Sequence, residues 1–128
     1  MAASVSRLRR LLDAQLAARA VSQQCRDVLA ILITEASTNA VRHSRTGDAF
    51  EVAIALDDHH CVLEIGNPDG EIDESKLHAG PPADGAEGGR GLPLIAALAD
   101  AVRIIRPRPG WVLVQIVKRL DRPVNAPA

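Results

Sequence analysis

The sequence has very little aromatic content, because Phe, Trp and Tyr make up only 2% of its 128 residues and tyrosine is absent. Single-stranded nucleic acids are usually bound by stacking their bases on aromatic side chains, so this scarcity argues against such a function. The formal net charge is −1, from 15 basic and 16 acidic residues. A dedicated DNA- or RNA-binding protein normally has a basic surface. We therefore expect no direct nucleic-acid partner.

Cysteines and long apolar runs are also scarce. Cys25 and Cys61 form no C-x-x-C pair, so zinc binding has no support and both are expected to be buried thiols. No apolar run approaches the roughly 18 residues that a membrane span needs. Asp13 interrupts the apolar stretch that follows Arg9-Arg10, unlike the apolar core of a signal peptide. We expect no membrane association, and the cytoplasm as the location.

The length and the 47% apolar content fit one domain with a single core of Leu, Ile, Val and Ala. We expect this domain to span residues 1–120. The tail over 121–128 has two prolines and no periodicity, which predicts a flexible end.

Hydrophobic periodicity predicts two helices and a hairpin in the first half of the chain. Leucines at helical spacing indicate an amphipathic helix over 4–20, and Ser22 is a favourable N-cap for a second helix that runs to about Ser44. Residues 50–56 and 61–65 alternate in the manner of an antiparallel hairpin with one buried face.

A long segment without periodicity follows the hairpin. Residues 66–91 are rich in glycine and acidic side chains, and structureless loops longer than about 12–15 residues are often lids or binding loops. We interpret this segment as a lid; a disordered insertion is the alternative. A short helix at 92–98 and strands near 101–106 and 111–119 complete an α+β pattern, with helices on one face of a mixed, mainly antiparallel sheet.

Glu35, Asn39 and His43 occur at successive turns of the second predicted helix, on or beside its apolar stripe. Polar groups there need partners, which are either internal or supplied by a ligand. Glu35 is suited to take a proton from a hydroxyl or water. The amide oxygen of Asn39 is a ligand type that Mg²⁺ accepts beside phosphate oxygens, and His43 is expected to line the same pocket. The alternatives are an exposed glutamate, an internally bonded asparagine and a structural histidine.

Gly88-Gly89-Arg90-Gly91 is a glycine-rich turn that opens onto the short helix. Glycine lets a backbone approach a polyphosphate closely, and the following helix adds its positive end. Pro93 removes one N–H donor, so phosphate contacts are expected from Gly89 to Leu92. The turn is neither a Walker A loop nor a dinucleotide fingerprint. A helix entry that only needs positive φ is the alternative interpretation.

Two of these stretches resemble a known family. Residues 35–44, with the sequence EASTNAVRHS, resemble the N-box of the Bergerat-fold ATPases, which include gyrase, the sensor histidine kinases and the anti-sigma-factor serine kinases. Residues 88–100 resemble the lid-closing glycine box of the last of these groups. The similarity covers roughly residues 4–119 and implies a two-layer Bergerat-type α/β sandwich that binds ATP with Mg²⁺.

The resemblance also implies roles for single residues. Glu35 would be the general base, and Asn39 the magnesium ligand. The residues that would contact the phosphates are Gly89, Arg90, Gly91 and Leu92. The family phosphorylates a serine on a small anti-anti-sigma (STAS-type) protein and sequesters a sigma factor. We therefore expect an ATP-dependent serine/threonine-protein kinase with those two partners.

The sequence departs from the family at two places. The aspartate that accepts a hydrogen bond from the adenine amino group is matched by Asn67, whose amide oxygen is a weaker acceptor than a carboxylate. Asp69 is the alternative acceptor if the loop shifts by two residues. The chain also lacks the edge strand that usually precedes the first helix, and homodimerisation is left open. A nucleotide- or partner-binding regulatory module with weak or no catalysis is the second hypothesis.

Overall fold

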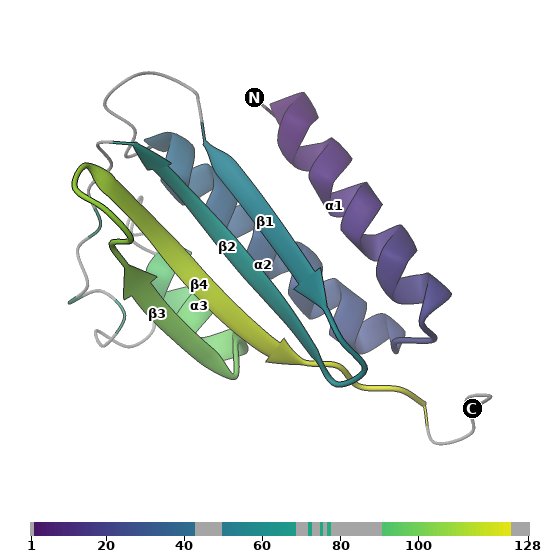
Figure 1. The fold of residues 1–128 in the computed structure, drawn as a ribbon. Coiled ribbons are helices and arrows are strands. Elements are labelled where there is room, and N and C mark those ends of the chain that lie inside the picture. Colours follow the sequence, from purple (N-terminus) through teal and green to yellow (C-terminus); the bar gives the residue numbers. More distant parts are fainter. Residues whose placement is uncertain are drawn as a thin grey trace, which may run out of the picture.

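The computed structural model of the protein describes residues 2–42, 50–68, 72, 75, 77 and 91–123. The elements, in chain order, are α1 (Ala2–Ala18), α2 (Gln23–Arg42), β1 (Glu51–Leu56), β2 (His60–Pro68), α3 (Gly91–Leu98), β3 (Ala101–Ile105) and β4 (Trp111–Arg119) (Figure 1). The predicted α+β class is confirmed, because these helices pack on one face of a four-stranded sheet.

The sheet has the strand order β1-β2-β4-β3, and each described pair of strands is antiparallel. The late strand β4 lies between the early hairpin and β3, so both halves of the chain contribute to one sheet. In Figure 1, α2 and α3 lie behind the sheet and α1 lies beside the edge strand β1. The sequence prediction allowed a mixed sheet, whereas the described strands form an antiparallel one.

The core lies between the inner face of the sheet and the helices, and it is aliphatic as predicted. Its side chains of at most 2% exposure include Leu12, Leu16, Leu29, Leu32, Ile33, Leu63, Ile65, Ile95 and Ile116. Burying a side chain of this size contributes roughly 1.5–3 kcal/mol, so such a core needs no aromatic residues. Among the described helices, none combines the length and the hydropathy required to cross a membrane.

Cys25 and Cys61 are both buried free thiols, which confirms the sequence prediction. Burial, with a smaller effect from Cys25, raises the pKa of Cys61 to about 12. The Cys61 thiol therefore stays protonated at neutral pH and packs as a small apolar side chain.

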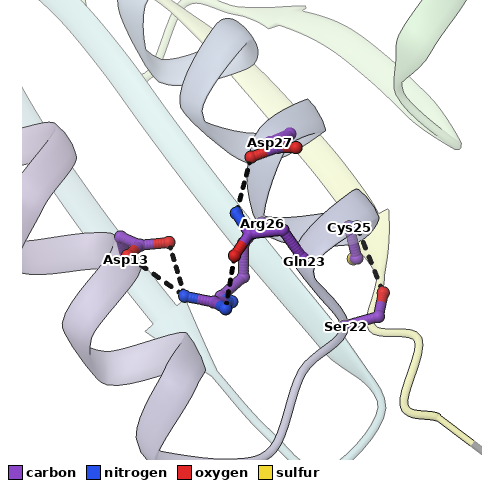
Figure 2. Close-up of polar contacts among 6 residues, drawn as sticks. All are labelled: Asp13, Ser22, Gln23, Cys25, Arg26 and Asp27. Atoms are coloured by element: carbon purple, nitrogen blue, oxygen red, sulfur yellow. Dashed lines mark hydrogen bonds and ion pairs between the residues drawn. The ribbon is translucent and has the colours of Figure 1, made fainter.

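The start of α2 is fixed by a cap and by contacts to α1 (Figure 2). Oγ of Ser22 accepts a hydrogen bond from the backbone N–H of Cys25 at 3.2 Å, so the predicted N-cap is confirmed. Nη1 of Arg26 lies 3.2 Å from Oδ1 of Asp13 in α1. Nη2 of Arg26 donates to Oε1 of Gln23 at 2.8 Å. The contact between Arg26 and Asp13 joins α1 to the first turns of α2, while the other two bonds lie within the start of α2.

Strand β2 continues to Pro68, beyond the predicted end at Ile65. Its last pairs with β4 are Gly66 with Leu113, Asn67 with Val112 and Pro68 with Trp111. Glycine, asparagine and proline in succession are typical of a turn, but pairing with a strand far along the chain overrides that local signal. Residues 66–68 therefore belong to β2, and most of the remaining residues of the predicted lid lie outside the described part of the chain.

The chain after β4 is bonded back to the connection between α1 and α2. The carbonyl of Asp121 accepts from the N–H of Ser22 at 2.7 Å, and Nε of Arg122 donates to the carbonyl of Arg19 at 2.9 Å. Asp121 and Arg122, at the start of the predicted flexible tail, therefore contact the domain, while the flexibility of the tail stays a prediction. Residues 124–128 lie outside the described part of the chain.

Candidate functional site

Glu35 and Asn39 lie one turn apart on α2, and each is half-buried. Ala36 and Ala40, which follow them in sequence, are 1% and 7% exposed and pack this side of the helix against the core. A spacing of four residues puts the two polar side chains on the same helix face, at the margin of its apolar stripe. The prediction that both residues lie on one helix is confirmed, and their roles in a site stay predictions.

Helix α3 begins at Gly91, directly beside the same two side chains. A Cβ atom at Gly91 would lie 3.5 Å from Oε2 of Glu35, 3.8 Å from the carbonyl oxygen of Glu35 and 4.0 Å from Cβ of Asn39. Because glycine lacks this atom, the backbone at the start of α3 faces the Glu35 carboxylate and Asn39 with no side chain between them. Two motifs far apart in the sequence therefore meet in the fold.

Leu92 and Ile95 anchor the start of α3 in the core, where they are 4% and 0% exposed. The side chain of Leu92 is thus committed to packing, and only its backbone is suited to contact a ligand. Pro93 follows without an N–H group. The first N–H groups of α3 belong to Gly91 and Leu92, at the positive end of the helix.

Several predicted site residues lie outside the residues that the structure describes. They are His43, Asp69, Gly89 and Arg90. Their expected contacts with ATP stay predictions. The described part of the candidate site consists of Glu35, Asn39, Asn67, Gly91 and Leu92.

Asn67 is 2% exposed on β2, and its Nδ2 donates a hydrogen bond to the carbonyl oxygen of Ala40 at 2.8 Å. Ala40 lies in the last turn of α2, where backbone carbonyls have no partner within the helix. Since a carbonyl can only accept, this contact fixes the orientation of the amide. An ionised aspartate has no donor for this bond. Sequence reasoning considered Asn67 only as an acceptor for adenine and missed this second role, although the replacement of a carboxylate by an amide was a signal for it.

A metal ion at this site would take most of its ligands from outside the protein. In the described part of the chain, no group of three or more His, Cys, Asp or Glu side chains is arranged to hold a metal ion. Mg²⁺ commonly binds through one or two protein oxygens, with phosphate oxygens and waters completing its shell. The amide oxygen of Asn39, on the same helix one turn after Glu35, is a ligand type that fits that pattern, so a cation here would arrive with a bound phosphate.

The comparison with protein families agrees with this geometry. The model of the histidine kinase-like ATPase domain matches residues 1–118 of the chain. The chain belongs to the histidine kinase-like ATPase domain family. No curated protein matches it with significant similarity.

Membership of this family indicates an ATP-binding domain. In this histidine kinase-like ATPase domain, the described groups that suit Mg-ATP are the Glu35 carboxylate, the Asn39 amide oxygen and the backbone at Gly91. A carboxylate can accept a proton, an amide oxygen can bind a cation, and the start of a helix favours phosphate.

Proposed function

We propose that the protein is an ATP-dependent serine/threonine-protein kinase of the anti-sigma-factor type. It binds Mg-ATP, phosphorylates a serine of an anti-anti-sigma (STAS-type) protein and sequesters a sigma factor. The single observation that supports this proposal most is the meeting of Glu35 and Asn39 with Gly91. Because these partners act in transcription, we propose that the protein is located in the cytoplasm.

The proposed chemistry assigns one task to each group. Mg-ATP, when bound, supplies the transferable phosphoryl group and the cation that balances its charge. Glu35 accepts the proton of the serine hydroxyl as that oxygen forms its bond to phosphorus and ADP departs. Asn39 holds the cation with its amide oxygen. The N–H groups at the start of α3 orient the phosphates, which limits their motion before transfer.

The test of the proposal separates transfer from binding. Glu35→Ala should abolish phosphotransfer to the anti-anti-sigma protein and leave ATP binding nearly intact, because the carboxylate acts on the substrate hydroxyl. The matched control is Glu51→Ala, at an exposed position on β1. Intact mass spectrometry of candidate partner proteins, incubated with Mg-ATP and each variant, measures transfer. Phosphorylation by Glu35→Ala at the wild-type rate would remove Glu35 as the base.

A second candidate function is a regulatory module that grips a partner with weak or no catalysis. The observation that favours it is the buried amide of Asn67, whose Nδ2 donates to the carbonyl oxygen of Ala40. The family that the sequence resembles has a carboxylate at this position, which would accept a hydrogen bond from adenine. The pairing of Glu35 with Asn39 argues against it. Calorimetry with Mg-ATP distinguishes the two functions, because absence of binding at about millimolar ATP, an affinity of only about −4 kcal/mol, would favour the module.

A further inference from the structure

Strand β1 lies at an edge of the sheet, and no described strand pairs with its outer side (Figure 1). At the end of the hairpin, the N–H of Asp57 donates to the carbonyl of His60 at 3.0 Å. Hydrogen-bonded and non-hydrogen-bonded pairs alternate along an antiparallel ladder. Every second residue back from Asp57 therefore bonds to β2, and the residues between them point their N–H and C=O groups outward. These residues are Val52, Ile54 and Leu56.

The outer edge of β1 has none of the features that usually prevent pairing with another strand. Natural edge strands are often protected by a lysine, a proline or a bulge. The sequence of β1 is EVAIAL, and its register with β2 is continuous over all six residues. The other edge strand, β3, is shorter and includes Arg103. The outer edge of β1 is therefore the edge suited to receive an additional strand.

A groove of about 350 Å³ lies between this edge and α1. That volume is within the range of roughly 300–1,000 Å³ that is typical of ligand pockets. Leu11 is 56% exposed beside the groove, and Ile54 and Leu56 are only half-buried. Apolar side chains thus lie next to outward-pointing backbone groups. Extended peptides bind such surfaces by strand addition, with backbone hydrogen bonds for affinity and side-chain pockets for specificity. The residues that line the groove are Leu11, Leu12, Gln15, Arg19, Ile54 and Leu56.

The wall that α1 contributes to the groove is cationic. Arg7, Leu11, Gln15 and Arg19 follow one another at intervals of four residues, so they lie along one side of the helix. Both arginines are exposed, and neither pairs with a carboxylate of the described residues. Arg19 lines the groove, and its Nη1 donates to Oε1 of Gln15 at 3.3 Å. A ligand along this wall therefore meets an apolar centre between two cations.

We propose that this groove binds an extended acidic segment of a partner protein, which adds to the sheet as a strand beside β1. The backbone of the segment bonds to the outward-pointing groups of β1. Alternate side chains enter the groove, with apolar ones against Leu11 and acidic ones at the two ends, toward Arg7 and Arg19. Acidic residues six positions apart in a strand are about 20 Å apart, and the two arginines are about 18 Å apart along a helix axis. The segment and the wall therefore match in length as well as in charge.

A second copy of this chain fits the groove poorly. If the β1 edges of two copies paired, the inward side chains of the second β1 would be those that already pack on its own core. The groove would then stay unfilled. Edge-to-edge pairing about a two-fold axis would also bring the two cationic α1 walls toward each other, which is repulsive. The charges therefore favour an acidic segment of another protein as the occupant.

The groove is separate from the candidate ATP site. Helix α3, which begins at Gly91, lies on the other side of α2 from α1 (Figure 1). The inference therefore does not rest on the proposed function. Because an extended segment loses conformational freedom when it binds, we expect a dissociation constant of about 10–100 μM.

A synthetic peptide tests the charge pattern. The probe is a fluorescently labelled, end-capped peptide of the sequence Glu-Thr-Leu-Thr-Val-Thr-Glu, titrated with the full chain and followed by fluorescence anisotropy. We expect saturable binding. Replacement of both glutamates by lysine should weaken binding by at least about tenfold, because like charges then meet at both ends of the groove.

N-methylated forms of the probe test strand addition itself. One form is methylated at the backbone nitrogens of the glutamates, leucine and valine, and the other at those of the three threonines. Only one of these alternate sets of N–H groups can face β1. One form should therefore lose binding by at least about tenfold, while the other should bind as the unmethylated probe does.

Variants of the chain locate the binding site. Leu11→Asp and Arg19→Glu should each weaken binding of the probe by at least about fivefold, because they place negative charge beside an acidic ligand. Both positions are exposed, so both variants should fold, which circular dichroism checks. The matched controls are Ile31→Asp, at a position that is 41% exposed on α2, and Arg10→Glu, at an exposed position of α1 outside the groove. Each control should change the affinity by less than about twofold.

Three results would overturn the proposal. The first is the absence of saturable binding of the probe to the wild type up to about 1 mM protein. The second is an equal effect of the two N-methylated forms, or an equal effect of the groove variants and their controls. The third is a wild-type dimer in sedimentation velocity at about 100 μM that Leu11→Asp dissociates, because the groove would then serve self-association.

Discussion

The side chain of Asn67 joins the sheet to the last turn of α2 through one hydrogen bond, from its Nδ2 to the carbonyl of Ala40. The side chain is buried, so water does not replace the bond if it is lost. A carboxylate at this position would place its oxygen against the carbonyl oxygen of Ala40, and both atoms are hydrogen-bond acceptors. It would also bury a negative charge. The local hydrogen bond therefore accounts for asparagine here, where the resembling family has aspartate.

Asn67→Asp is expected to lower the free energy of unfolding by about 1–3 kcal/mol at neutral pH, because the carbonyl of Ala40 loses its donor. Burial raises the pKa of the new carboxyl group, and its protonated form can donate again. The loss of stability should therefore shrink as the pH falls through that raised pKa. Urea unfolding of both proteins from about pH 8 to about pH 5 measures this difference. Equal urea midpoints throughout would contradict the assigned bond.

At the scale of elements, α1 and α2 are held together by an ion pair as well as by apolar packing. Leu12 and Leu16 of α1 are 2% and 0% exposed in the core. The side chains of Arg26 and Asp13 are 20% and 46% exposed. Partial exposure to solvent screens such a pair, so the leucines carry most of the association between the helices.

Asp13→Asn is expected to lower the free energy of unfolding by about 0.5–1 kcal/mol at low salt, because Arg26 loses its partner in α1. The difference from the wild type should fall toward zero near about 1 M NaCl, where the screening length is about 3 Å. Thermal unfolding at the two salt concentrations provides the measurement. Asp58→Asn, in the exposed turn between β1 and β2, is the matched control and should have little effect. An equal effect of both substitutions would show that the pair contributes nothing specific.

The elements were largely predictable from the sequence, and the exceptions share one cause. One-sided burial repeats every 3.6 residues in a helix and every second residue in a strand, so periodicity located each element within a few residues. Residues 66–68 were assigned to irregular structure on local grounds although they form the end of β2, and the hydrogen bonds of residues 121–122 were not predicted. Their partners are β4 and the connection after α1, both distant in the sequence. Pairing of this kind leaves no local signal.

At the scale of the whole molecule, the strand order β1-β2-β4-β3 brings distant parts of the chain to one side of the sheet. Helix α2 supplies Glu35 and Asn39, and α3 supplies Gly91 beside them. This meeting was predicted from two motifs and their resemblance to one family. The second role of Asn67 was not, because it depends on where the last turn of α2 lies over β2.

The most direct test of the account is calorimetric titration of Mg-ATP into the wild type and Gly91→Ala. The added methyl group would make only ordinary contacts, the nearest at 3.5 Å from Oε2 of Glu35, so the variant should fold normally. We predict saturable one-to-one binding that requires Mg²⁺ in the wild type, and affinity weaker by at least about tenfold in the variant. Absence of saturable heat up to about millimolar Mg-ATP, or unchanged affinity in Gly91→Ala, would contradict a nucleotide site between α2 and the start of α3.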